Sequence, residues 1–322
     1  MMEDFERRLI AGDRVTLARA ITLVESSRAD HQEEARALVE RILPLTGNSI
    51  RVAITGVPGA GKSTFIESLG THITQDLGET VAVLAIDPSS PVSGGSILGD
   101  KTRMPKLSVD GKAFIRPTAS AGGLGGVHSR TRETILLCEA AGYRNILVET
   151  VGVGQSEVSV SAMTDFFLLL LLPNAGDELQ GIKRGIVEMA DLIAVNKADA
   201  NPAQAELTRR NFENALMYVP AQAASNNKWS VRVTTCSALT GMNVAAIWSQ
   251  VREYRGLAEA NGLFHAKRQG QQVRWLSDAV RQGVEDWLAS SPEAAALKRD
   301  VEAKRLSPIE GAARLVARLW SI

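Results

Sequence analysis

The sequence contains few of the residues that signal disulfide or metal chemistry. Among its 322 residues are 2 cysteines, Cys138 and Cys236, and 4 histidines. The cysteines are far apart, and together with the scattered histidines they give no metal-ligand spacing. Basic and acidic side chains balance at 36 each, so we expect no electrostatic attraction to nucleic acid or to an anionic membrane.

Long apolar runs are also missing. The longest strongly apolar segment, residues 166–172, is far too short to span a bilayer. It is typical of a strand buried on both faces of a parallel sheet. The N-terminal residues lack the basic and then apolar layout of a signal peptide. We therefore expect a cytoplasmic protein that binds neither nucleic acid nor membranes.

One segment carries a phosphate-binding pattern. Residues 56–63, GVPGAGKS, match the Walker A motif between a β-branched run and a stretch of helical periodicity. Its glycines let successive amide N–H groups point into one nest for phosphate oxygens, with the positive end of the next helix behind them. Lys62 is expected to reach the β- and γ-phosphates, and the Ser63 hydroxyl to bind Mg²⁺. The predicted phosphate-loop residues are Gly56, Val57, Pro58, Gly59, Ala60, Gly61, Lys62 and Ser63.

A later strand pattern, residues 145–149, ends in an acidic residue. Glu149 stands three residues before Gly152, which is the layout of a Walker B element merged with a γ-phosphate-sensing turn. We expect Glu149 to hold Mg²⁺ directly or through water, or to help orient the attacking water. The Gly152 amide is expected to contact the γ-phosphate.

The base specificity is predicted by an N-K-x-D tetrapeptide at residues 196–199. Its aspartate can accept two hydrogen bonds from guanine N1–H and the 2-amino group, which adenine cannot offer. Small residues after the last strand pattern would let backbone amides approach guanine O6. We therefore expect GTP as substrate and GDP as product. The predicted guanine-side residues are Asn196, Lys197, Asp199, Ser237, Ala238 and Leu239.

These patterns predict an α/β fold, a P-loop NTPase parallel-sheet G domain flanked by helical N-terminal and C-terminal extensions. Residues 1–47 are expected to form two helices joined near residues 26–31, and residues 48–256 the P-loop GTPase domain. Residues 257–322 are expected to form a C-terminal helical arm whose apolar stripes and tryptophans suit a homodimer interface. The expected strands are 51–55, 80–86, 145–149, 166–172, 191–195 and 231–236, while 113–116 is only a short run within a Gly/Ser/Pro-rich region.

Two regions have the composition of responsive loops. A Gly/Ser/Pro-rich region runs from about residue 88 to residue 130, where a P-loop domain places switches that sense the γ-phosphate and Mg²⁺. Residues 173–185 place glycines beside charged residues at the expected carboxyl edge of the sheet. A solvated turn followed by a helix start is the alternative for this second region.

Together these segments resemble the MeaB/ArgK family, the cobalamin-enzyme branch of the SIMIBI P-loop GTPases. The resemblance covers nearly the whole chain, and its family-specific strings are ETVGVGQSE at 149–157 and GDELQGIK at 176–183. It implies a GTPase chaperone of an adenosylcobalamin-dependent acyl-CoA mutase, methylmalonyl-CoA mutase or a relative. Such a chaperone gates cofactor loading and protects or reactivates the mutase, and is typically a homodimer through its C-terminal arm. The phosphate-loop match extends to Thr64.

The resemblance also implies roles for individual residues. Asp87, Asp100 and Glu149 become candidates for Mg²⁺ binding or water positioning, and Lys183 lies in a third switch loop that reports on the partner. Val153 stands where small GTPases place a water-orienting glutamine, so unassisted hydrolysis should be slow. Our hypothesis is that the mutase orders residues 174–185 and brings Lys183 or another charged group to the phosphates.

Two other classes of protein share the phosphate-binding pattern. A kinase that phosphorylates a protein of a transport system would use the same phosphate cradle, although the N-K-x-D pattern argues against ATP as the donor. A metal-insertion GTPase would be expected to carry His or Cys clusters, for which the sequence offers no suitable spacing.

Overall fold

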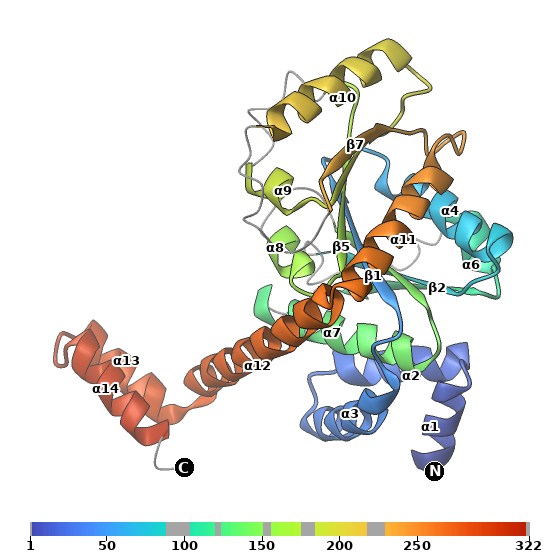
Figure 1. Ribbon diagram of the computed structural model, residues 1–322. Coiled ribbons are helices and arrows are strands. Elements are labelled where there is room, and N and C mark those ends of the chain that lie inside the picture. Colours follow the sequence, from blue (N-terminus) through green and yellow to red (C-terminus); the bar gives the residue numbers. More distant parts are fainter. Residues whose placement is uncertain are drawn as a thin grey trace. The chain divides into compact units, whose positions relative to one another are not determined.

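The computed structural model describes residues 2–87, 104–119, 124–150, 156–174, 184–217 and 229–319 (Figure 1). The chain divides into two compact units, Met1–Gln271 and Gln272–Ile322, which are considered separately. No helix in the described ranges has the length and apolarity needed to cross a membrane.

The first unit is built on a seven-stranded parallel sheet with the order β3-β2-β4-β1-β5-β6-β7. All six expected strands are present, the short run that begins at Ala113 forms a seventh, and the predicted α/β P-loop fold is confirmed. The strands are β1 (Ile50–Gly56), β2 (Val81–Asp87), β3 (Ala113–Ala119), β4 (Asn145–Thr150), β5 (Phe166–Leu171), β6 (Leu192–Val195) and β7 (Arg232–Thr235). Because β1 is central and the chain moves to both sides of it, the carboxyl end of β1 is where a ligand is expected.

Helices lie on both faces of the sheet (Figure 1), and each face has its own hydrophobic core. Alternation along β4 assigns its side chains: Ile146 and Val148 join one core, whereas Leu147 joins the other. The helices of this unit are α1 (Met2–Ile10), α2 (Arg14–Glu25), α3 (Ala29–Ile42), α4 (Lys62–Thr71), α6 (Pro105–Val109), α7 (Leu124–Ala140), α8 (Ser156–Ser161), α9 (Arg184–Met189), α10 (Pro202–Leu216) and α11 (Val244–Ala260). Short one-turn helices also cover Leu43–Leu45 and His72–Asp76.

The N-terminal region contains three helices rather than the two expected. A break separates α1 from α2, because Gly12 adopts a φ of 79° and Asp13 caps the next helix. The Asp13 carboxylate accepts a hydrogen bond from the Thr16 backbone N–H at 3.0 Å. The apolar residues of all three helices, including Leu9, join the core that also contains α7.

The second unit is helical. It contains the later part of α12 (Leu263–Ser290), then α13 (Pro292–Glu302) and α14 (Pro308–Leu319). Ser291 caps α13 by accepting from the Ala294 N–H at 3.3 Å. Several apolar side chains of this unit are exposed: Val273, Leu276, Val280, Ile309 and Val316.

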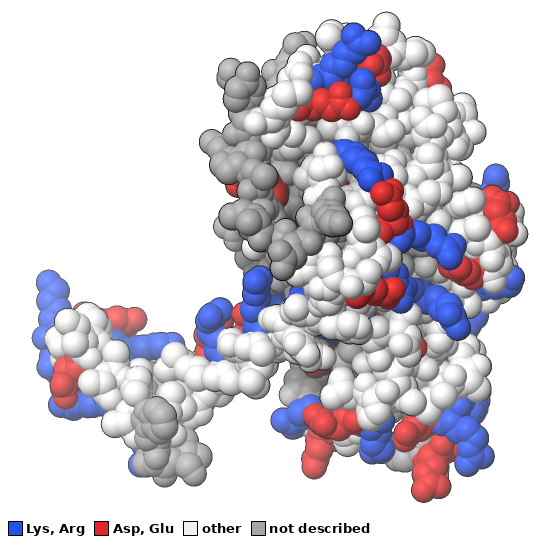
Figure 2. Space-filling view, in the orientation of Figure 1, with Lys and Arg blue, Asp and Glu red and all other residues white. Residues whose placement is uncertain are grey.

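On the face drawn in Figure 2, basic and acidic side chains are interspersed, in keeping with the balanced composition.

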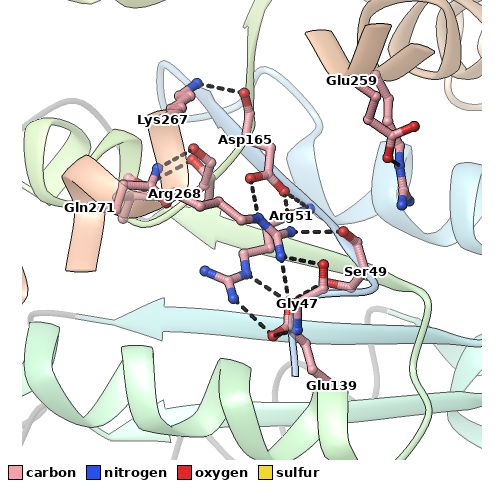
Figure 3. A network of polar contacts seen from close by, with 12 residues as sticks. Gly47, Ser49, Arg51, Glu139, Asp165, Glu259, Lys267, Arg268 and Gln271 are labelled. Carbon is pink, nitrogen blue, oxygen red and sulfur yellow. Dashed lines mark hydrogen bonds and ion pairs between the residues drawn. The ribbon is translucent and has the colours of Figure 1, made fainter. Parts of the chain in front are cut away.

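A buried network of ion pairs fixes the amino end of β1 (Figure 3). The Arg51 guanidinium donates two hydrogen bonds to Glu139 of α7, at 2.9 and 2.8 Å. Arg268, at the start of α12, donates to Asp165 at 2.9 and 2.7 Å and to the backbone carbonyl of Gly47 at 2.8 Å. The network therefore joins the end of the N-terminal helical region, the central strand, α7 and the first turns of α12.

The charges in this network are compensated. Burial alone would raise the pKa of Asp165, but the hydrogen bonds and charge of Arg268 hold it below its usual value. The pKa of Glu139 is likewise lowered, with Arg51 and Arg268 outweighing its burial. Buried ion pairs of this kind become costly when one partner is removed, since the remaining charge has no water to solvate it.

We therefore predict that Arg268→Met lowers the free energy of unfolding by about 3–5 kcal/mol, because Asp165 would be left buried without its cation. Urea denaturation followed by circular dichroism measures the change. Arg274→Met, at an exposed position on the same helix, is the control and should change stability by less than about 0.5 kcal/mol. Equal stability of the two variants would contradict this account of the network.

Candidate functional site

The Walker A segment forms the turn between β1 and α4. Gly56 ends β1 with a φ of 153°, and a Cβ built there would lie 2.3 Å from the Leu170 carbonyl oxygen. Gly61 has a φ of 84°, and its Cβ would lie 2.8 Å from Asn196 Nδ2. Close contact with Leu170 at one position and with Asn196 at the other, together with positive φ angles, therefore requires glycine at both.

Lys62 begins α4 and folds back over the loop. Its Nζ donates to the carbonyl oxygens of Gly56 at 2.8 Å and Val57 at 3.3 Å. Burial lowers the pKa of Lys62, while the charges of Glu149 and Glu157 act in the opposite direction. The ammonium is thus held inside the loop that the sequence predicts for phosphate, with two carboxylates nearby.

Ser63 and Glu149 are brought together at the carboxyl edge of the sheet. The Ser63 hydroxyl donates to Glu149 Oε1 at 2.8 Å, and Glu149 is only 7% exposed. The next residue, Thr150, donates through its hydroxyl to Thr55 at 2.8 Å, which links the ends of β4 and β1. Both carboxylate and hydroxyl oxygens therefore lie beside the first turn of α4.

The N-K-x-D segment meets the phosphate loop through a side-chain amide. Asn196 Nδ2 donates to the Ala60 carbonyl at 2.7 Å, and its Oδ1 accepts from the Ala238 N–H at 2.9 Å. Lys197 follows with a φ of 60° and an exposed side chain, and Asp199 is also exposed. The turn after β6 therefore adjoins both the phosphate loop and the loop after β7.

The loop after β7 has the small residues that the sequence predicts. Ser237 is buried, and its N–H donates to the Met242 carbonyl at 3.0 Å. Leu239, in contrast, is 80% exposed. Because the Ala238 N–H donates to Asn196, the backbone of this loop lies next to the N-K-x-D turn, while the Leu239 side chain lies at the surface.

Several predicted site residues fall outside this geometry. Asp100, Gly152 and Lys183 lie outside the described residues, and Asp87 is described only as the last backbone position of β2. Three further residues lie at the site although the sequence does not single them out: Thr55, Thr150 and Glu157. Thr150 and Glu157 stand inside the ETVGVGQSE string, but nothing in the string says which atoms face β1 or Lys62.

The strand, phosphate loop and helix, with an acidic residue at the end of β4 and an N-K-x-D turn after β6, define a P-loop nucleotide-binding protein of the GTPase type. A protein-family model described as "Methylmalonyl Co-A mutase-associated GTPase MeaB" matches residues 17–293. The chain therefore belongs to the MeaB family of P-loop GTPases, as its motifs predict.

Named relatives agree with this assignment. The chain is 46% identical over 288 residues to "GTPase ArgK" of Escherichia coli, covering 89% of this chain and 86% of the relative. It is 43% identical over 315 residues to "Methylmalonic aciduria type A homolog, mitochondrial" of Mus musculus, covering 93% and 75%. A solved structure described as "Crystal structure of LAO/AO transport system kinase" matches with a TM-score of 0.77 and 37% identity, over 99% of this chain and 97% of that chain.

We predict that Gly61→Ala weakens GDP binding by about tenfold or more, because a left-handed alanine costs about 1–2 kcal/mol and its Cβ would press on Asn196. Isothermal titration with GDP measures the loss. Gly256→Ala is the control: this glycine lies in α11 with nothing within 4 Å of its added Cβ, and GDP binding should be unchanged. Unaltered affinity in Gly61→Ala would refute the role given to this close contact.

Proposed function

We propose that this protein is a Mg²⁺-dependent GTPase that acts as chaperone of an adenosylcobalamin-dependent acyl-CoA mutase, methylmalonyl-CoA mutase or a relative. The observation that carries the nucleotide part is the joining of the phosphate loop, the Ser63–Glu149 pair and the N-K-x-D turn at one edge of the sheet. The partner is supported by the family description and by the name of the mouse relative.

Different residues of the chain would bind the phosphates and the guanine base of GTP. Backbone amides of the phosphate loop would hold the phosphate oxygens, and Lys62, released from its carbonyl partners, would neutralise the β- and γ-phosphates. Asp199 would accept from the guanine ring, while Ala238 and its neighbours would lie near O6. The exposed position of Asp199 supports this assignment, because a base could reach its carboxylate.

The donor set near Ser63 fits Mg²⁺. A hydroxyl oxygen and a buried carboxylate lie 2.8 Å apart, and Mg²⁺ prefers hard oxygen ligands. We propose that Ser63 and Glu149 hold the ion directly or through water, with Asp87 and Asp100 as further candidates. When bound, Mg²⁺ would neutralise charge on the phosphates. Glu149 and the Gly152 amide would also help orient the attacking water.

The hydrolysis step is proposed to need the partner. The residue directly after Gly152 is Val153 and not glutamine, so we expect slow hydrolysis by the isolated protein. We propose that the mutase orders residues 174–185, which include Lys183 and Asp177, and so completes the site for hydrolysis. In this proposal, hydrolysis is coupled to delivery of the cofactor and to release of damaged cofactor.

The domain boundaries and the assembly are part of the same proposal. We assign residues 1–47 to a helical extension, 48–256 to the GTPase domain and 257–322 to an arm that forms a homodimer in the cytoplasm. The exposed apolar residues of the second unit support the dimer, since Val273, Leu276 and Val280 are each at least 60% exposed. Phosphotransfer to a protein is the second candidate, favoured only by the word "kinase" in the name of the matched solved structure.

The first experiment measures GTP hydrolysis with and without a purified adenosylcobalamin-dependent mutase, with ATP in parallel. We expect strong stimulation confined to GTP, and a reduced stimulated rate in Lys183→Ala but not in Lys106→Ala, an exposed control on α6. Absence of stimulation would remove the partner assignment. Transfer of labelled phosphate to a protein acceptor would instead support the kinase.

A second prediction tests base recognition. Asp199→Asn should weaken GTP binding by about tenfold to a hundredfold, because hydrogen bonds to a charged group contribute about 1.5–3 kcal/mol. The asparagine amide can donate to the 2-oxo group of xanthine, so binding of xanthosine triphosphate should improve. Fluorescent-nucleotide competition measures both changes. Asp4→Asn, at an exposed position of α1, is the control, and unchanged GTP preference in Asp199→Asn would exclude this aspartate from base recognition.

A further inference from the structure

The strand β3 is one end of the sheet, and within the described residues it pairs only with β2. The Val81 N–H donates to the Lys112 carbonyl at 3.0 Å, so the backbone polar groups of Lys112 point toward β2. Successive residues of a strand direct their N–H and C=O groups to alternate sides. Residues 113, 115 and 117 therefore direct theirs away from the sheet, and Pro117, which lacks an N–H, stands at one of these outward positions.

A groove follows this outer edge. Its volume is about 500 Å³, with α2 along one side and α6 on the other. Phe114 and Ile115 both line it, although they belong to the cores on opposite faces of the sheet. The groove therefore reaches the outer edge of the strand at these two residues. Its lining residues are Arg14, Val15, Ala18, Arg19, Thr22, Ser108, Phe114 and Ile115.

The groove carries positive charge. Two of its lining residues are arginines and none is acidic. Within the described part of the chain, neither Arg14 nor Arg19 forms an ion pair; Arg14 donates to the Asp110 backbone carbonyl at 3.1 Å. Arg19 is exposed, and Val15 beside it is 55% exposed. An occupant with carboxylates on the side facing α2 would complement this surface.

The groove at the opposite edge of the sheet differs in charge. It lies along β7 and has a volume of about 550 Å³. Its Arg232 already pairs with Glu253 at 2.6 and 2.7 Å, and its Glu213 pairs with Arg209. The charges there are thus satisfied within the chain, whereas no carboxylate of the described residues pairs with either arginine of the groove along β3.

We propose that the groove along β3 binds an extended segment of a partner protein that adds to the sheet as a further strand. The segment's carbonyls would accept from the Ile115 N–H, and its N–H groups would donate to the outward carbonyls of β3. Carboxylates at alternate positions of the segment would pair with Arg14 and Arg19. The proposal rests on the edge, the groove and the charge, and is independent of the proposed function.

A synthetic, fluorescein-labelled peptide of alternating valine and glutamate tests charge recognition. We expect the full chain to bind it and to ignore a peptide of alternating valine and lysine. Arg19→Glu should weaken binding about tenfold, because an ion pair is lost and the introduced carboxylate repels those of the peptide. Arg36→Glu, an equal charge change at an exposed position of α3, should leave binding unchanged. Failure to bind the glutamate peptide, or equal binding by the two variants, overturns the proposal.

Amide hydrogen exchange, resolved by residue, tests strand addition. In the free protein the Ile115 amide should exchange faster than the amides of Phe114 and Arg116, which face β2. The glutamate peptide should slow Ile115 selectively. If Ile115 is already as protected as its neighbours, the chain itself covers the edge and the proposal fails. If the peptide binds without protecting Ile115, strand addition is wrong.

Discussion

The nucleotide site depends on one buried side-chain amide that joins loops from distant parts of the sequence. Asn196 donates to the carbonyl of Ala60 in the phosphate loop and accepts from the N–H of Ala238 in the loop after β7. Breaking either bond would leave a buried polar atom unpaired, at a cost of about 1–3 kcal/mol. The phosphate loop, the N-K-x-D turn and the loop after β7 are therefore held in one mutual geometry.

The opposite end of the central strand is held by charge rather than by an amide. Arg51 sits in β1 itself and pairs with Glu139, while Asp165 accepts from the Arg51 backbone N–H at 2.8 Å and pairs with Arg268. One end of β1 thus leads into the phosphate loop, and the other is tied to α7 and the start of α12. Such anchoring gives the loop a rigid base, which a site that orders phosphates requires.

Strand positions and the nucleotide motifs could be predicted because each depends on local spacing. The buried ion network could not, since Arg268 and Asp165 are 103 residues apart and no local pattern pairs them. The same holds for Asn196, whose motif predicts a base contact but not a bond to Ala60. The break after α1 is different: Gly12 and the Asp13 cap are local signals in the sequence, although the helical periodicity around them favours a continuous helix.

The two end strands of the sheet, β7 and β3, differ in the charges that they present to another extended chain. An unpaired edge strand risks pairing with any extended chain, and proteins limit this with proline and charge. At β7 the charges are mutually neutralised by Arg232 and Glu253, so they offer little to a ligand. At β3, Pro117 limits the edge to few donors, while Arg14 and Arg19 repel basic segments. The same features that block unselective pairing there leave an acidic segment as the chain that fits.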